Sequence, residues 1–384
     1  MNTVSAKQIG IRESGSVDWL LFLATLPILA AGLATMYSFT DANTFFFKQL
    51  AWIAVSFVLF FGGSFLDWRF LRKSDILFAL FLGGVFLLVF LFGAGRIVKG
   101  AQSWFDFGAV SFQPVEIVKL VLILLLAKYF SRRHIEIGHL RHIFVSGAYA
   151  LALGVLVLLQ PDFGGTIVIF CIWLGMMLVS GISKKHLAAV LLAGFFALLL
   201  LWSFVFADYQ RERLVSFLHP LADVRGAGYN AYQSTVAIGS GGFLGKGVGF
   251  GSQSRLQFLP EYETDFIFAA FAEEWGFFGV AVLFSLYGVL FWRILANALR
   301  GSTNFEILFG LGLAIFLLSQ FFIHVGMNLG LLPVTGITLP FMSYGGSNLA
   351  TLFLGLGILM GMRRYRLTSH KEAMQNEFVG ITAE

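Results

Sequence analysis

The segment 75–95 has the sequence DILFALFLGGVFLLVFLFGAG and contains no charged residue after Asp75. An apolar run of this length is long enough to cross the ~30 Å hydrocarbon core of a bilayer as a single helix. Its hydrophobicity does not alternate from one residue to the next, which excludes a strand of a porin-type barrel. The segment therefore predicts a transmembrane α-helix.

Similar segments recur along the whole chain. Of its 384 residues, 58% are hydrophobic and only 12% are charged, and the mean hydropathy is +0.83. A soluble domain of this composition would expose too much apolar surface to water. We predict an all-α, polytopic membrane protein, with one membrane domain over 18–366 that contains ten transmembrane helices. The predicted spans are 18–38, 45–66, 75–95, 113–130, 141–160, 163–181, 185–206, 266–293, 304–328 and 343–363.

The loops between these spans alternate in their content of basic residues, so the net charge of +5 indicates topology rather than nucleic-acid binding. By the positive-inside rule we expect cytoplasmic termini, 1–17 and 367–384, and one long extracellular loop, 208–264, between the seventh and eighth spans. The lone Cys171 excludes an intrachain disulfide. The loops expected outside carry, apart from the long one, only Lys48, Arg96 and Lys99.

The long polar loop ends in the sequence LPEYETDFIF, residues 259–268, which carries Asp265 into the eighth span. A carboxylate at such a boundary can face both water and a lipid-borne substrate, and Asp265 is our candidate general base. The alternative is a helix cap, because Thr264 and Asp265 open the predicted helix and acidic residues stabilise its first turn.

Other ionisable residues lie inside predicted spans. Glu116 and Lys119 share one face of the fourth span, where they pair with each other, face a polar cavity or extend to the outer interface. Glu273 and Glu274 would lie roughly 12 Å deeper than Asp265 if the eighth helix is regular. Their role is open between chemistry and packing against Lys119, His324 or a water pocket.

The glycine-rich stretch 239–251 resembles a phosphate-binding loop only superficially. Ser240 and Gly247 occupy positions where the P-loop pattern needs Gly and Ser or Thr. A flexible surface loop is the favoured interpretation, although Lys246 among exposed backbone N–H groups could bind a diphosphate.

Several motifs occur together in a characteristic order. On these residues the chain resembles the SEDS proteins (shape, elongation, division and sporulation), and RodA more than FtsW, over about residues 18 to 366. The motifs are Lys48-Gln49, Trp104, Gln113-Pro114-x-Glu116-x-x-Lys119, Gln160-Pro161-Asp162-x-Gly164, Tyr209-Gln210-x-x-Arg213, Gly228-Tyr229 with Gln233-Ser234, Thr264-Asp265-Phe266-Ile267-Phe268 with Glu273-Glu274, Leu332-Pro333-Val334-Thr335-Gly336, Leu339-Pro340-Phe341 and Ser343-Tyr344-Gly345-Gly346-Ser347.

The resemblance implies a ten-span peptidoglycan glycosyltransferase of the bacterial cytoplasmic (inner) membrane, which polymerises lipid II outside and acts in cell elongation and shape. It implies a class B penicillin-binding protein, a transpeptidase, as partner. It also implies that Asp265 is the essential acidic residue, that Trp104 is functionally sensitive and that Glu116 pairs with Lys119. Ser103 departs from the family, which commonly has Arg there.

We hypothesise that Asp265 accepts the proton of the GlcNAc 4-hydroxyl of one lipid II while that oxygen attacks C1 of the MurNAc of another. The configuration at C1 inverts and undecaprenyl diphosphate leaves. Candidate ligands for the diphosphate are Lys48, Lys119, Arg213 and Lys246, and Gln233 and Ser343 are candidates for sugar or peptide. No cofactor is required by the sequence, and a divalent cation (Mg or Mn) is compatible with it although no ligand cluster indicates a metal.

Two alternatives belong to other functional classes. A lipid II flippase would also use intramembrane charges such as Lys119 and Glu273, and a non-catalytic scaffold would only activate the penicillin-binding partner. A flippase needs polar groups along the whole crossing path, whereas the charges here gather toward the predicted outer half. The sequence therefore favours the enzyme.

Overall fold

The computed structural model describes residues 17–38, 44–98, 101–106, 108, 111–131, 140–205, 211, 215, 217, 228–256 and 258–381. Most of these residues are helical. The helices are α1 Trp19–Ser38, α2 Thr44–Phe65, α3 Ser74–Ala94, α4 Pro114–Ser131, α5 Leu140–Leu159, α6 Phe163–Val179, α7 Lys184–Leu200, α9 Tyr229–Ser240, α10 Ser252–Arg255, α11 Ile267–Ala298, α12 Asn304–Asn328 and α13 Gly346–Ile381, with a 3-10 turn η1 Trp68–Arg72 and a π turn η2 Leu201–Val205.

Each predicted span coincides with one helix, and most boundaries agree within a few residues. The largest difference is α13, which begins at Gly346 and continues to Ile381 instead of ending near 363. Seven described helices are long and apolar enough to cross a membrane, namely α1, α2, α3, α5, α7 with its π turn, α11 and α12. The helix α6 is apolar but shorter. The chain is therefore a polytopic helical protein, and the total of ten crossings stays a prediction.

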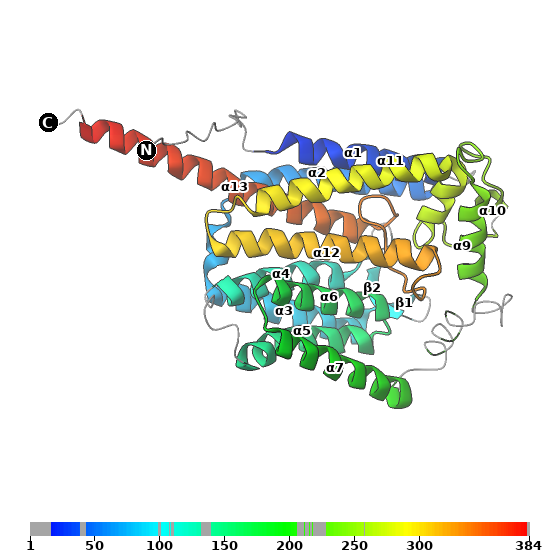
Figure 1. The fold of residues 1–384 in the computed structure, drawn as a ribbon, viewed down its shortest axis with the longest axis horizontal. Coiled ribbons are helices and arrows are strands. Elements are labelled where there is room, and N and C mark those ends of the chain that lie inside the picture. Colours follow the sequence, from blue (N-terminus) through cyan, green and yellow to red (C-terminus); the bar gives the residue numbers. More distant parts are fainter. Residues whose placement is uncertain are drawn as a thin grey trace, which may run out of the picture.

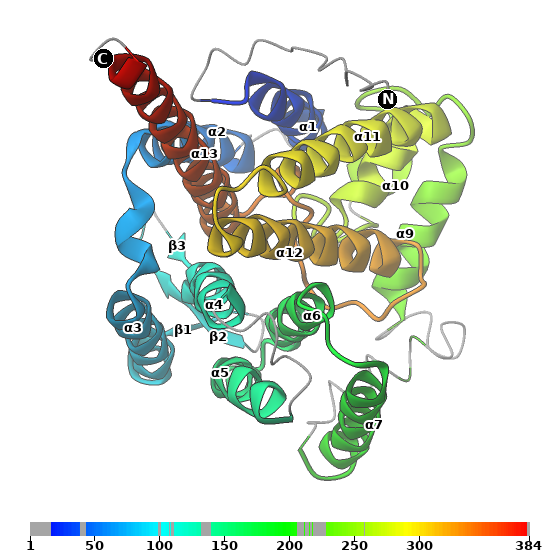
Figure 2. The ribbon, with the colours of Figure 1, turned by 60° about the vertical axis from the view of Figure 1, so that its left-hand side comes forward.

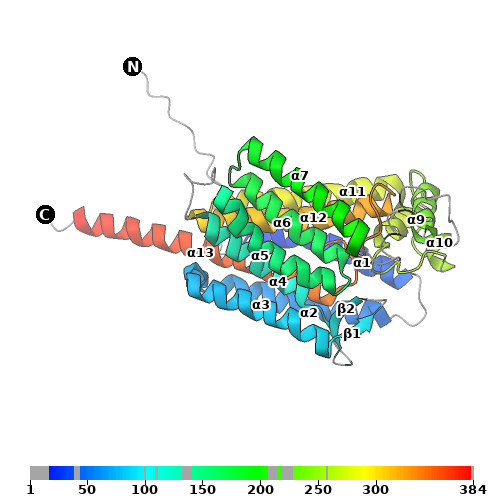
Figure 3. The ribbon, with the colours of Figure 1, turned by 90° about the horizontal axis from the view of Figure 1, so that it is seen from below.

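The two ends of the helix bundle differ (Figures 1 and 3). One end carries the small sheet, α9 and α10, and we call it the loop end. The opposite end carries η1, the turn between α11 and α12 and the outer part of α13, and we call it the basic end. The described basic residues of the basic end include Arg69, Arg72, Lys73, Lys184, Lys185, Arg293 and Arg300.

The core of the bundle is built around α4 and α12. Nearly every residue of α4 from Pro114 to Ala127 is buried, and 67% of the most apolar window of α12 is buried. In contrast, no residue of α7 is buried among the described residues, and Figure 2 shows this helix at the periphery. Because lipid replaces water around such helices, exposure of apolar side chains here marks a lipid-facing surface rather than a defect.

A three-stranded antiparallel sheet corrects the all-α prediction. Its strands are β1 Arg96–Val98, β2 Ala101–Asp106 and β3 Ser111–Phe112, in the order β1-β2-β3. Trp104 on β2 is paired in register with Arg96 on β1. The strands are too short to show a clear alternation of hydrophobic residues, so no pattern in the sequence predicted them.

A break inside α11 corrects the assumption of a regular helix after Asp265. Gly276 has φ 63° and ψ −167°, a conformation that side chains of L-residues rarely adopt. A Cβ at this position would overlap the backbone nitrogen of Gly245. The glycine thus permits the loop after α9 to pack directly against the helix axis.

Candidate functional site

Asp265 lies at the loop end, in the turn 261–266 that leads into α11. The N-cap of α11 is Phe266, so Asp265 stands one residue before the cap position. A carboxylate there still complements the helix dipole, so the alternative role as a helix-start residue stays open beside that of a base. The side chain is partly exposed. Its Oδ2 lies 3.7 Å from the point where a Cβ on Gly336 would stand, so the loop after α12 forms one wall beside the carboxylate.

Asn328, the last residue of α12, holds the backbone on both sides of this turn. Its Nδ2 donates to the carbonyl oxygen of Asp265 at 2.9 Å, and its Oδ1 accepts from the backbone N–H of Ala269 at 3.2 Å. The hydroxyl of Ser234 on α9 donates to the Asn328 carbonyl at 2.8 Å. One fully buried side chain thus connects α9, α11 and α12 at the candidate base.

Ser343 supports the same turn from the other side. Its hydroxyl donates to the carbonyl oxygen of Thr264 at 2.7 Å and accepts from the backbone N–H of Leu339 at 2.8 Å. The Nε2 of Gln49 donates to the carbonyl oxygen of Ser343 at 3.2 Å. Ser343 is buried, and both interactions of its hydroxyl are internal. It is therefore placed to fix Thr264 and Asp265 rather than to reach an open surface.

Glu116 and Lys119 form the ion pair that the resemblance implies. The Nζ of Lys119 lies 2.8 Å from Oε1 of Glu116, and both side chains are buried. Asn348 donates from Nδ2 to the other carboxylate oxygen, Oε2, at 2.7 Å, and the ammonium lies over the ring of Phe316. The pair is enclosed by α4, α12 and α13, which rules out extension of either side chain to the bilayer interface.

Asp162 caps the neighbouring helix α6. Its Oδ1 accepts from the backbone N–H of Gly165 at 2.7 Å, and Nε2 of Gln113 donates to Oδ2 at 3.4 Å. Burial raises the pKa of the Asp162 carboxyl, and the Gly165 N–H and the charge of Lys119 oppose this rise. The Gln-Pro-Asp motif thus ties the start of α6 to the start of α4.

Lys246 is engaged with a carboxylate inside the protein. Its Nζ lies 2.7 Å from Oε1 of Glu273, which is fully buried, and 2.8 Å from the hydroxyl of Ser252. Glu273 also accepts from the backbone N–H of Gln253 at 3.1 Å. These partners of Glu273 belong to the long loop. Lys119, expected as one alternative, pairs with Glu116 instead. The Nδ1 of His324 bonds the carbonyl oxygen of Ile337 at 2.7 Å.

The remaining predicted site residues occupy different surroundings. Lys48 is exposed near the start of α2, next to buried Gln49. Trp104 is partly buried on β2, and Gln233 is partly buried on α9. Arg213 lies outside the described residues.

The segment between α12 and α13 connects the two main clusters. Ser343 bonds Thr264 beside Asp265, and Asn348, in the first turn of α13, bonds Glu116. The Asp265 turn and the Glu116–Lys119 pair therefore share one supporting segment. Lys246 instead belongs to a separate cluster around Glu273.

No role was predicted from the sequence for Asn328 or Asn348, and Gln49 was named only as part of a motif. Their polarity could have singled them out, because a polar side chain inside or at the end of an apolar span is unfavourable unless it has a hydrogen-bond partner. Which partner each one takes depends on contacts between segments far apart in the chain.

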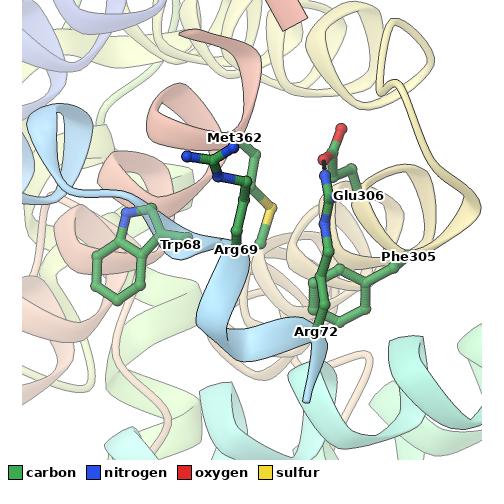
Figure 4. Close-up of a pocket in the computed structure, with 6 residues that line it drawn as sticks. All are labelled: Trp68, Arg69, Arg72, Phe305, Glu306 and Met362. Atoms are coloured by element: carbon green, nitrogen blue, oxygen red, sulfur yellow. Dashed lines mark hydrogen bonds and ion pairs between the residues drawn. The ribbon is translucent and has the colours of Figure 1, made fainter. Parts of the chain in front are cut away.

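A pocket at the basic end is separate from this site. Figure 4 shows it with its lining side chains, and the Nη2 of Arg72 lies 2.5 Å from Oε1 of Glu306 on one side. Glu306 is in the first turn of α12 whereas Asn328 is its last residue, so the pocket and Asp265 lie at opposite ends of the bundle. The lining residues are Trp68, Arg69, Arg72, Phe305, Glu306 and Met362.

No group of three or more His, Cys, Asp and Glu side chains that could hold a metal ion occurs within the described part of the chain. Of the three neighbouring histidines at positions 134, 139 and 142, His142 is described, and its Nδ1 bonds the Tyr129 hydroxyl at 2.9 Å. The other two histidines lie outside the described residues.

A family model for cell cycle proteins, FtsW/RodA/SpoVE, matches residues 16–368. The chain belongs to this family. It is 42% identical over 289 residues to the peptidoglycan glycosyltransferase MrdB of Escherichia coli (strain K12), covering 75% of this chain and 77% of that protein. It is 35% identical over 368 residues to the stage V sporulation protein E of Bacillus subtilis (strain 168), covering 91% and 98%.

Solved structures agree with this assignment. The rod shape determining protein RodA of Thermus thermophilus matches with a TM-score of 0.67 and 31% identity, over 90% of this chain and 96% of that one. A chain from a peptidoglycan synthase complex, described as coordinating polymerization and crosslinking, matches with a TM-score of 0.76 and 33% identity, over 91% and 98%. The resemblance to SEDS proteins and to RodA is confirmed.

Proposed function

We propose that this family member is a peptidoglycan glycosyltransferase that polymerises lipid II at the outer face of the bacterial cytoplasmic membrane during cell elongation. The names of its relatives and the polytopic bundle support this activity. The proposal includes ten membrane crossings and cytoplasmic termini, with the loop end outside and the basic end inside, as the distribution of Lys and Arg favours.

The placement of Asp265 carries the proposal. Its carboxylate is partly exposed at the loop end, and Asn328 and Ser343 clamp the backbone carbonyls of Asp265 and the preceding residue. A general base is most effective when its position is fixed before the substrate binds. Asp265 would accept the proton of the GlcNAc 4-hydroxyl as that oxygen attacks C1 of MurNAc, with inversion and departure of undecaprenyl diphosphate.

The leaving diphosphate needs positive charge nearby, and the ion pairs of the structure order the candidates. Lys119 and Lys246 are each neutralised by a buried carboxylate. Lys48 is exposed and directly precedes Gln49 in α2, and Gln49 donates to the carbonyl oxygen of Ser343 in the segment beside Asp265. We therefore assign the diphosphate first to Lys48 among the described candidates. Arg213, outside the described residues, stays a candidate from the sequence, with a divalent cation as an additional source of charge.

A class B penicillin-binding protein completes the proposal as partner. Its support is the similarity to a chain whose structure concerns coordinated polymerization and crosslinking. A transpeptidase bound at the loop end would receive the new glycan strand where it is made.

The decisive experiment supplies labelled lipid II to the purified protein in vesicles and separates the products by size. The wild type and Asp67→Asn are expected to give glycan ladders, and Asp265→Asn none. Asp67 is a matched control, since it is an exposed carboxylate at the basic end, paired with Arg69. Ladders undiminished in Asp265→Asn would refute the base. Translocated but unpolymerised lipid II would indicate a flippase, and no ladders from the wild type without its partner would indicate a scaffold.

A further inference from the structure

The glycine-rich segment 241–250, between α9 and α10, exposes large apolar side chains. Leu244 is 76% exposed and Phe250 is 69% exposed, and Phe243 and Val248 are exposed as well. Its one charged residue, Lys246, is paired with Glu273. An apolar patch of this kind on a loop in water would be unfavourable and marks a surface that another apolar phase covers.

The backbone of this segment is hydrogen-bonded within the protein. The N–H groups of Lys246 and Gly247 donate to the carbonyl oxygens of Glu273 and Glu274, each at 3.0 Å. In the other direction, Phe277 N–H donates to the Gly242 carbonyl at 2.9 Å. The break at Gly276 leaves these carbonyl and N–H groups of α11 without partners inside the helix, and the glycine-rich segment supplies the partners.

Two further bonds complete the arrangement. The backbone N–H of Gly249 donates to Oε1 of Glu274 at 2.6 Å, and that of Phe278 to the Phe243 carbonyl at 3.0 Å. Irregular backbone can enter the hydrocarbon region only when its polar groups have protein partners. The glycine-rich segment satisfies this requirement at these positions, unlike an ordinary surface loop.

The length of α1 shows where the segment 241–250 lies along the bilayer normal. Asp18, directly before α1, is bonded to Arg293 at the basic end, with 2.6 Å between Oδ2 and Nη2. The carbonyl oxygen of Ser38, at the other end of α1, lies 3.7 Å from the Cβ position of Gly249. The 20 residues of α1 span ~30 Å, the thickness of the hydrocarbon core. The segment therefore lies at the outer boundary of that core.

The exposed apolar side chains continue onto the lipid-facing surface of α11. The ring of Phe243 stacks on that of Phe277, with 5.8 Å between centroids, and Phe277 and Phe278 are both exposed. Because α11 is a candidate membrane span, the same acyl chains that contact Phe277 extend to Phe243.

We propose that the glycine-rich segment 241–250 is a re-entrant element seated in the outer leaflet, with its apolar side chains among lipid acyl chains. Its bonds to Glu273 and Glu274 then hold the first turns of α11, and Asp265 before them, at the level of the lipid head groups. This inference does not depend on the proposed activity, and it replaces the expectation of a flexible, water-exposed loop.

Site-directed spin labelling tests the insertion. Cys171 is the only cysteine in the chain, so Cys171→Ser gives a background in which Phe243→Cys, Leu244→Cys and Phe250→Cys are labelled one at a time. The full-length protein is reconstituted in vesicles of phosphatidylethanolamine and phosphatidylglycerol. Collision with oxygen, which concentrates in the bilayer, is compared with collision with a water-soluble nickel chelate. Phe284→Cys on the exposed side of α11 and Asp106→Cys on β2 are the lipid and water references.

The expected ratio of oxygen to nickel accessibility at Leu244 and Phe250 is severalfold higher than at Asp106 and close to that at Phe284. A ratio like that of Asp106 would place the segment in water and overturn the proposal. Low accessibility to both reagents would also overturn it, because a protein neighbour, and not lipid, would then cover the patch. Labels at three positions keep the test valid if one variant does not fold.

Discussion

The side chain of Asn328 donates a hydrogen bond to the carbonyl oxygen of Asp265, with 2.9 Å between nitrogen and oxygen. The bond joins the last residue of α12 to the turn before α11, two points far apart in the sequence. Because it fixes the backbone and leaves the carboxylate untouched, it positions the candidate base without neutralising it.

Asn328→Ala is expected to reduce polymerisation more than it reduces lipid II binding. The change leaves the Asp265 carbonyl and the Ala269 N–H without their partner, which costs ~1–3 kcal/mol for each buried group. Thermal unfolding and turnover at saturating lipid II measure the two effects. Thr235→Ala is the control, since the hydroxyl of this exposed residue donates to the Tyr232 carbonyl oxygen within α9. Normal turnover in Asn328→Ala would contradict the positioning role.

Lys48→Met is expected to affect the KM for lipid II, and Lys246→Met the stability of the protein. Lys48 is exposed, so its loss should raise the KM for lipid II without changing the unfolding temperature. Lys246 is paired with buried Glu273, so its loss should lower the unfolding temperature, because an unpaired buried carboxylate is strongly unfavourable. Steady-state kinetics and thermal unfolding of both variants check this. A raised KM in Lys246→Met with unchanged stability would restore Lys246 as a diphosphate ligand.

The Glu116–Lys119 pair is expected to show strong coupling in a double-mutant cycle. Glu116→Gln or Lys119→Met alone should destabilise by ~3–5 kcal/mol, because each leaves a buried charge unpaired. The double variant should lose far less than the sum of the two single variants. Denaturant or thermal unfolding in one detergent supplies the three values. The exposed pair Asp67 and Arg69 is the control and should show no measurable coupling. Additive effects at Glu116 and Lys119 would disprove the pairing.

Gly276→Ala is expected to destabilise the protein, whereas Gly288→Ala in the same helix should not. Gly276 has positive φ and no space for a Cβ beside Gly245. A Cβ on Gly288 would stand in open space, and alanine in a helix is favoured over glycine by ~1 kcal/mol. The unfolding temperatures of the two variants give the comparison. Equal stability would mean that the helix break is not required.

The sequence predicted the helical class and the positions of the helices well, because each depends on local hydrophobicity. The segment 75–95 was expected to be one span, and α3 covers nearly the same residues. The sequence also singled out Asp265 and the Glu116–Lys119 pair, since ionisable residues inside or beside an apolar span are costly and therefore conspicuous.

Only the tertiary structure decided how these residues are supported. The three-stranded sheet, the break at Gly276 and the partners of Lys246 and Asn328 all depend on contacts between distant segments. A glycine-rich sequence has the same composition whether its backbone faces water or bonds to a broken helix. Hydrophobicity is a property of each residue and can be summed along the chain, whereas a hydrogen bond is a property of two groups that folding must first bring together.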